Sequence, residues 1–140
     1  MAISEKLLSR LKDPTLVTEK ALIAGAWVGA SEGSATFEVT NPANGDVIAT
    51  LPDLGRSETA RAIDAADTAQ KAWAVKTGKD RAAILRRLYD LMVENADDLA
   101  AILTMEMGKP LAEAKGEILY GASYVEWFGE EAKRIYGDTI

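Results

Sequence analysis

A chain of 140 residues, 48% hydrophobic and 27% charged, is long enough for one ordinary hydrophobic core and is far from a disordered composition. Its formal net charge of −6 argues against nucleic acid or an anionic membrane surface as a partner, because both favour a basic face. Cysteine and histidine are absent, which excludes disulfides, thiolate nucleophiles, imidazole bases and the usual zinc ligand sets from this chain.

No stretch predicts export or membrane insertion. The start, MAISEKLLSR, carries Glu5 and lacks an apolar core of signal-peptide length, and no later window approaches the ~18 apolar residues of a membrane span. We therefore expect a cytoplasmic protein. The sequence also has no G-x-S-x-G elbow, no G-x-G-x-x-G turn after a strand and no Walker lysine, so the chain is expected to be scaffold.

Residues 1–20 predict an N-terminal arm with a short amphipathic helix. Asp13-Pro14 is expected to end this helix, because the residue before a proline is pushed out of the helical region. The apolar residues that recur at helical spacing are Ile3, Leu7, Leu8 and Leu11.

Residues 21–52 predict a small antiparallel β region, because short apolar runs alternate with turn residues. Gly25 is expected to turn one short hairpin. Asn41-Pro42 and Asn44-Gly45 are expected to bend the chain between strands at residues 37–40 and 47–51.

Residues 57–140 predict about four helices, each with a recognisable start. Ser57 is expected to cap the first helix, which runs to about Trp73. The pairs Thr77 with Asp80 and Asn95 with Asp98 are spaced as capping boxes for the second and third. The expected apolar stripes are Ile84, Leu85, Leu88, Leu91 and Met92 on the second helix, and Leu99, Ile102 and Leu103 on the third.

Glycine and proline mark the remaining helix ends. Gly108 is placed to end the third helix and Pro110 to open the fourth, which is expected to run to about Tyr136 and to close at Gly137. These helices offer more packing surface than a small β region can cover. The predicted fold class is therefore α+β as a fragment, an incomplete part of a larger domain.

Five segments of the chain, in this order and spacing, resemble the aldehyde dehydrogenase superfamily along nearly its full length. The run EMGKPLAEAKGEI, joined to the last of these segments, looks most like the succinate-semialdehyde dehydrogenase branch. The segments are IAGAWV, FEVTNPANGDVIATLP, AIDAADTAQKAW, RAAILRRLYDLMVENADDLAAILTMEMGKPLAEAKGEI and YGASYVEWFGEEAKRIYGDTI.

The resemblance implies an α/β aldehyde dehydrogenase fold in a considerably longer enzyme, with residues 57–140 as the helical part of an incomplete cofactor-binding domain. The complete enzyme would attack an aldehyde with a cysteine thiolate, transfer hydride to NAD or NADP and hydrolyse the thioester to the acid. Those catalytic and cofactor-binding residues would lie beyond Ile140, so this chain alone is expected to bind no cofactor and to be inactive. The implied partners are the remainder of its own catalytic chain, a small aldehyde and further copies in a homo-oligomer.

Glu106 occupies the next position on the third stripe, at the helix end where the macrodipole disfavours a carboxylate. It could point to solvent and pair with Lys109. Alternatively it could turn inward toward the Asn41-Pro42 bend and be buried there against backbone N–H groups or an ion. For the ion, the resemblance implies a structural monovalent cation held by the main-chain carbonyl of Thr40 and by Glu106.

The fourth helix has a packing stripe and a second, unusual face. That face carries Gly116, Tyr120 and Trp127, although a glycine inside a helix costs about 1 kcal/mol relative to alanine. The resemblance, aligned on YGDTI, places Gly116 and Tyr120 in the tunnel by which the aldehyde reaches the thiolate. A glycine would widen that tunnel, and a phenol could bond a substrate carboxylate. The packing stripe is Leu111, Ala114, Ile118, Ala122, Val125 and Ala132.

A second hypothesis belongs to another class of protein. The chain could be a self-standing, non-catalytic interaction or assembly module derived from the same segment. Fold alone does not separate the two hypotheses, since the chemistry would reside in residues outside this sequence.

Overall fold

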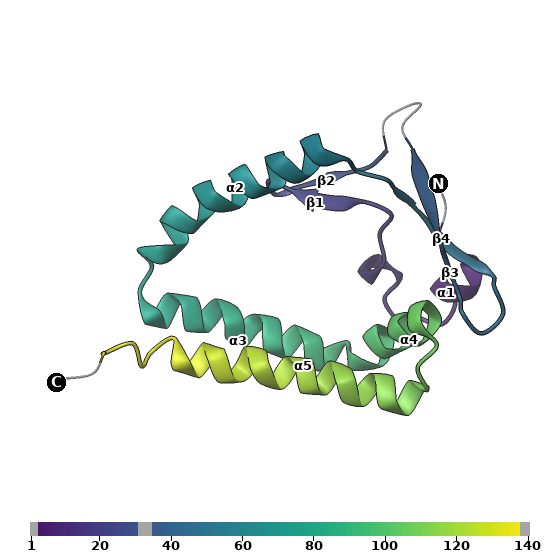
Figure 1. Cartoon of the computed structure of the whole chain (residues 1–140). Coiled ribbons are helices and arrows are strands. Elements are labelled where there is room, and N and C mark those ends of the chain that lie inside the picture. Colours follow the sequence, from purple (N-terminus) through teal and green to yellow (C-terminus); the bar gives the residue numbers. More distant parts are fainter. Residues whose placement is uncertain (1–2, 31–34, 138–140) are drawn as a thin grey trace.

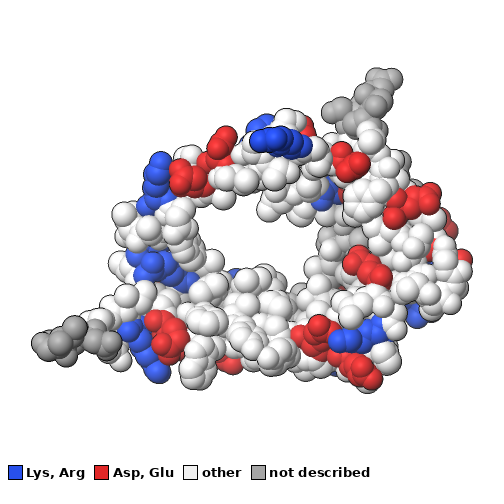
Figure 2. All heavy atoms as spheres, viewed as in Figure 1, with Lys and Arg blue, Asp and Glu red and all other residues white. Residues whose placement is uncertain are grey.

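The computed structural model describes residues 3–30 and 35–137. Over these residues the chain forms five α-helices, one 3-10 helix and two separate two-stranded antiparallel sheets. The elements follow one another around a ring with an open centre (Figures 1 and 2). The fold therefore agrees with the predicted α+β fragment, a β region followed by helices.

The N-terminal arm contains helix α1, Glu5–Leu8, and the 3-10 helix η1, Pro14–Leu16. Helix α1 is shorter than its apolar spacing predicts. The Ser4 hydroxyl caps α1 by accepting the Lys6 N–H at 3.2 Å. The Ser4 N–H donates to the carbonyl of Ile48 at 2.8 Å, which ties the arm to the β region.

Both predicted hairpins are present. Strand β1, Ala21–Ile23, pairs with β2, Ala26–Val28, through a turn in which Ala24 and Gly25 both have positive φ. This is the backbone of a type I′ hairpin turn. Strand β3, Thr36–Thr40, pairs with β4, Val47–Pro52, with an irregularity in register beside Thr40.

Four longer helices follow: α2, Arg56–Ala74; α3, Gly78–Glu94; α4, Ala96–Met107; and α5, Leu111–Glu131. The Thr77 hydroxyl caps α3 as predicted, accepting the Asp80 N–H at 3.2 Å. Gly108 ends α4 with φ of 78°, a left-handed conformation that glycine adopts without strain. The local start and stop signals at these two positions are confirmed.

Two predicted helix boundaries are wrong, and one predicted capping bond is absent. Gly55, not Ser57, is the N-cap of α2, because the Glu58 carboxylate reaches back to accept the Gly55 N–H at 3.2 Å. Asn95 is the N-cap residue of α4 as predicted, but its side chain makes no capping bond and donates instead to the carbonyl of Leu91 at 2.9 Å. Helix α5 ends at Glu131 and not near Tyr136, because the N–H groups of Lys133 and Arg134 donate to the carbonyls of Glu130 and Glu131, three residues back in the chain.

The core has two parts. One lies under the N-terminal arm and consists of Leu7, Leu11, Ile48 and Met105. The other is the contact of α5 with α3 and α4, where small side chains let the helices approach closely. Its most buried residues are Ala82, Ala96, Ala100, Ala114, Ala122 and Gly129. Figure 1 shows α3 and α5 lying side by side along one edge of the ring.

The predicted apolar stripes are only partly covered. On α3, Ala82 is buried, whereas Ile84 is 49% exposed and Leu88 and Leu91 are also exposed. On α5, Ala114 and Ala122 of the predicted stripe are buried, but Leu111 is exposed. The predicted stripe of α5 therefore faces the other helices. The predicted stripe of α3 is largely exposed, because α3 contacts α5 through small residues such as Ala82 and not through its large apolar side chains.

Helix α2 has almost no tertiary support. None of its residues is buried, and strand β1 is its main neighbour. Figure 2 shows the opening that separates α2 and the β1–β2 hairpin from α3. No helix in the described part of the chain combines the length and hydropathy needed to cross a membrane.

Candidate functional site

The four residues singled out by the sequence lie at two places. Thr40 ends strand β3, and Glu106 is in the last turn of α4. Gly116 and Tyr120 lie one turn apart on α5. The first pair belongs to the predicted cation site, and the second pair belongs to the predicted tunnel face.

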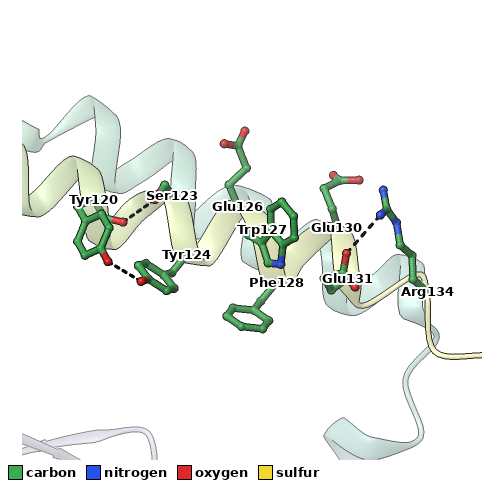
Figure 3. Close-up of a pocket in the computed structure, with 9 residues that line it drawn as sticks. All are labelled: Tyr120, Ser123, Tyr124, Glu126, Trp127, Phe128, Glu130, Glu131 and Arg134. Carbon is green, nitrogen blue, oxygen red and sulfur yellow. Dashed lines mark hydrogen bonds and ion pairs between the residues drawn. The ribbon is translucent and has the colours of Figure 1, made fainter. Parts of the chain in front are cut away.

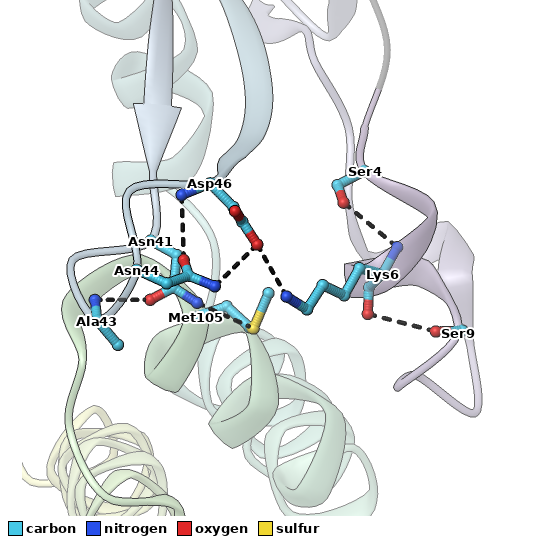
Figure 4. A network of polar contacts seen from close by, with 8 residues as sticks. All are labelled: Ser4, Lys6, Ser9, Asn41, Ala43, Asn44, Asp46 and Met105. Atoms are coloured by element: carbon cyan, nitrogen blue, oxygen red, sulfur yellow. Dashed lines mark hydrogen bonds and ion pairs between the residues drawn. The ribbon is translucent and has the colours of Figure 1, made fainter.

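The bend after Thr40 is closed by its own hydrogen bonds. Asn41 is buried, and its Oδ1 accepts the Ala43 N–H at 2.9 Å while its Nδ2 donates to the sulfur of Met105 at 3.6 Å (Figure 4). The Asn41 carbonyl accepts the Gly45 N–H at 2.8 Å. This network fixes the bend against α4 through side chains and backbone of the chain itself.

A positive charge of the chain lies beside this bend. The Lys6 Nζ is 2.8 Å from the Asp46 carboxylate, which also accepts a bond from the Asn44 side chain (Figure 4). The hydrogen bond from Lys6 is the main cause that lowers the pKa of Asp46 below 3.8. The N-terminal arm thus supplies an ammonium group to the acidic side of the bend.

Removing this ammonium should raise the pKa of Asp46. In Lys6→Met we expect the Asp46 pKa to move up toward the ordinary value of an aspartate side chain. Because the folded pKa is depressed, the contact stabilises the fold above the unfolded pKa, and that stability is lost as pH falls through the folded pKa. Carboxyl carbon shifts measured by NMR between about pH 2 and pH 6 would report the change. Lys12→Met is the control, and an Asp46 pKa equal in all three proteins would contradict the assignment.

Glu106 is exposed, so the expectation that it would be largely buried is wrong for the described structure. The earlier residues of the same stripe are half-buried: Leu99, Ile102 and Leu103. At the last turn of α4, the stripe position occupied by Glu106 is open to solvent. The alternative partner, Lys109, is bonded to Glu117 instead. The described residues contain no group of three acidic side chains able to hold a metal ion. Cation binding by Thr40 and Glu106 stays a prediction.

Gly116 and Tyr120 lie on an open face of α5. A Cβ added at Gly116 would meet no atom within 4 Å. The Tyr120 side chain is 63% exposed, and its hydroxyl lies 2.6 Å from the Tyr124 hydroxyl (Figure 3). The two rings pack edge to face, with centroids 5.0 Å apart and an interplanar angle of 89°.

A groove of about 730 Å³ runs along α5 from this tyrosine pair toward the helix end. Its apolar wall is formed by Trp127, which is 65% exposed, and by Phe128 (Figure 3). Its three carboxylates each have a cationic partner: Glu126 with Arg86, Glu130 with Lys133, and Glu131 with Arg134, at 3.2, 3.0 and 3.4 Å. The groove is thus an apolar surface with a phenol pair at one end.

Sequence reasoning missed the contact of Tyr124 with Tyr120. The signal was present, because side chains four residues apart on a helix are neighbours. The hydrogen bond between the phenols raises the pKa of Tyr124, since it stabilises the protonated phenol. The Tyr124 phenol is therefore held more firmly in its protonated form.

Sequence reasoning also missed the role of Asp98. The side chain is 4% exposed and does not cap α4. Its two oxygens accept the N–H groups of Lys12 and Asp13 at 3.0 and 2.8 Å. Asp98 therefore fastens the N-terminal arm to α4 beneath the Asn41 bend.

The family model for the aldehyde dehydrogenase family matches residues 27–140. The chain belongs to the aldehyde dehydrogenase family. Over 131 residues, it is 60% identical to a glutarate-semialdehyde dehydrogenase of Pseudomonas aeruginosa and 56% identical to an NADP-dependent succinate-semialdehyde dehydrogenase of Escherichia coli. Each alignment covers 94% of this chain and 27% of the relative.

The solved aldehyde dehydrogenases share the arrangement of elements. A crystal structure of succinate-semialdehyde dehydrogenase from Burkholderia pseudomallei superimposes with a TM-score of 0.87 at 58% identity, covering 93% of this chain and 27% of that one. A 3-sulfolactaldehyde dehydrogenase of Pseudomonas putida is 57% identical over 130 residues. This aldehyde dehydrogenase chain spans about a quarter of the length of the relatives it matches.

Proposed function

We propose that this chain is part of an NAD(P)-dependent aldehyde dehydrogenase that oxidises succinate semialdehyde to succinate through a cysteine thioester. The support is the identity of 56–60% to three relatives named for succinate semialdehyde, glutarate semialdehyde and 3-sulfolactaldehyde. Those three aldehydes share an anionic group, a carboxylate or a sulfonate, at the end away from the carbonyl. An anionic aldehyde is therefore the substrate class that this likeness favours.

Within that enzyme the described residues would line the path of the substrate and would not take part in the chemical steps. We propose that Gly116 and Tyr120 line the substrate tunnel. Gly116 would leave room beside the helix, because a Cβ there meets open space. The Tyr120 phenol would donate a hydrogen bond to the anionic end of the aldehyde, an interaction between a neutral donor and a charged acceptor.

The described residues do not fit a dinucleotide. Both of their sheets are two-stranded antiparallel hairpins, and none of the described strands leads through a glycine-rich turn into a helix as pyrophosphate binding in a βαβ unit requires. NAD or NADP would therefore be held by residues of the complete enzyme outside this sequence. No step of the reaction is assigned to the described side chains.

The test is substrate preference in the complete enzyme. We expect a kcat/KM for succinate semialdehyde well above that for acetaldehyde, with NAD and NADP assayed in parallel. The isolated 140-residue chain should show no turnover above a blank without protein, because the sequence holds no cysteine to form the thioester. A complete enzyme that prefers acetaldehyde would overturn the substrate, and turnover by the isolated chain would overturn the scaffold role.

The competing proposal is a self-standing interaction or assembly module. It draws on the same exposed faces, α2 and the aromatic side chains of α5. A compact, monomeric 140-residue chain that binds no hydrophobic dye would favour the module. Self-association or dye binding would favour a part of a larger domain, because exposed apolar faces of this kind need a partner.

A further inference from the structure

In the α5 groove, the hydroxyl of Tyr120 is hydrogen-bonded to a second phenol. The hydroxyls of Tyr120 and Tyr124 lie 2.6 Å apart, and the edge-to-face packing of the rings holds that distance. Two phenols carry two hydroxyl hydrogens, and the bond between them uses one. One O–H is left to donate to an acceptor outside the pair.

We propose that Tyr124 is a positioning residue that donates its hydroxyl hydrogen to Tyr120, so that the Tyr120 O–H is directed to the anionic group of the aldehyde substrate. This inference rests on the proposed function and deepens it. Tyr120 would touch the substrate, whereas Tyr124 would act only through Tyr120.

The direction of the hydrogen bond follows from the ligand that Tyr120 would bind. When the Tyr120 hydrogen is donated to an anion, the Tyr120 oxygen is left as the acceptor and the Tyr124 hydroxyl, 2.6 Å away, is the donor. A hydroxyl that accepts one hydrogen bond becomes a better donor of the next, since bonds in a chain polarise one another. Tyr120 is thus both oriented and strengthened as a donor by its neighbour.

The surroundings leave this donor available for an anion. The nearby Ser123 hydroxyl donates to the main-chain carbonyl of Tyr120 at 2.7 Å, so its own hydrogen is already used (Figure 3). The groove carboxylates are paired with arginine or lysine, which weakens their repulsion of an anionic ligand. The aromatic wall of Trp127 and Phe128 suits the methylene part of a short aldehyde acid.

The experiment compares two aldehydes of four carbons in the complete enzyme, succinate semialdehyde and butanal, which lacks the carboxylate. In Tyr124→Phe we expect the KM for succinate semialdehyde to rise about three- to tenfold, the size of one hydrogen bond, with kcat little changed. The constants for butanal should change far less. Tyr120→Phe should raise the KM for succinate semialdehyde at least as much, and the double variant no more than Tyr120→Phe alone, because the two residues act in series.

Tyr89→Phe is the matched control. It removes a phenol hydroxyl from α3 but keeps the ring, which stacks under the Arg86 guanidinium at 4.8 Å. Its constants should equal those of the wild type. Calorimetric binding of succinate to Tyr124→Phe gives a second measurement, independent of turnover, and should weaken by a similar factor.

Two results overturn the inference while leaving the proposed function standing. One is a wild type that prefers succinate semialdehyde to butanal but a Tyr124→Phe variant with unchanged KM and unchanged succinate binding. The other is an equal rise of KM for both aldehydes, which indicates a general disturbance of the groove. A wild-type enzyme without preference for succinate semialdehyde overturns both the inference and the proposed function.

Discussion

Replacing Asp98 by alanine is expected to lower the free energy of unfolding by about 2–4 kcal/mol, since two charge-assisted hydrogen bonds are lost together. The carboxylate is buried and accepts the N–H groups of Lys12 and Asp13, 86 and 85 residues away in sequence. Alanine leaves both donors without a partner in a place that water reaches poorly. Asp98→Asn should have an intermediate effect, because the amide has one accepting oxygen instead of two.

The measurement is the urea midpoint of the complete protein together with amide hydrogen exchange at Lys12 and Asp13. Exchange at these two amides should speed up in Asp98→Ala even where the midpoint moves little. The neighbouring Asp97 is the control, because its bonds go to the side chains of Lys12 and Lys115 on the surface. Similar losses in Asp97→Ala and Asp98→Ala would show that Asp98 does not fasten the arm.

Gly78→Ala is expected to destabilise the protein by about 1–3 kcal/mol, the usual cost of forcing an extra group into a filled contact. A Cβ at Gly78 would lie 2.5 Å from the carbonyl oxygen of Ala132, which belongs to the backbone and cannot rotate away. The first turn of α3 or the end of α5 would have to move. Helix propensity alone predicts the opposite sign, because alanine is the better helix former.

The same substitution at Gly116 separates the two effects. There the added methyl meets no atom within 4 Å, so Gly116→Ala should stabilise the protein by up to about 1 kcal/mol through propensity alone. The two unfolding midpoints should therefore move in opposite directions from the wild type. Shifts of the same sign would mean that the close contact between Gly78 and Ala132 is absent in solution.

Local signals in the sequence predicted local structure well. The turn at Gly25, the cap at Thr77 and the stop at Gly108 were all placed correctly. Each depends on a backbone conformation or a hydrogen bond within about four residues, which the sequence specifies directly. The contact between Tyr120 and Tyr124 was not predicted, although it is equally local, because side chains four residues apart on a helix are neighbours.

Burial was predicted less well, because it depends on what covers a residue and not on its neighbours in sequence. The capping pattern placed Asp98 at a helix start, and the apolar stripe offered Glu106 an inward position, whereas in the structure Asp98 is buried and Glu106 is exposed. Asp98 is buried because the arm crosses α4 there. Glu106 is exposed because no described segment covers its side of the last turn of α4. Neither fact has a signature within a few residues of the side chain concerned.

The sequence by itself determined the order of the elements, the two hairpins, most helix starts and the family likeness. The tertiary structure alone decided which helix faces are covered, that α2 and the aromatic side of α5 remain open, and that a buried carboxylate joins the arm to α4. The physical reason is the distance along the chain between the residues that interact. Turns and caps are stabilised by bonds between near neighbours, whereas burial and the pairing of Asp98 join segments more than 80 residues apart in the chain.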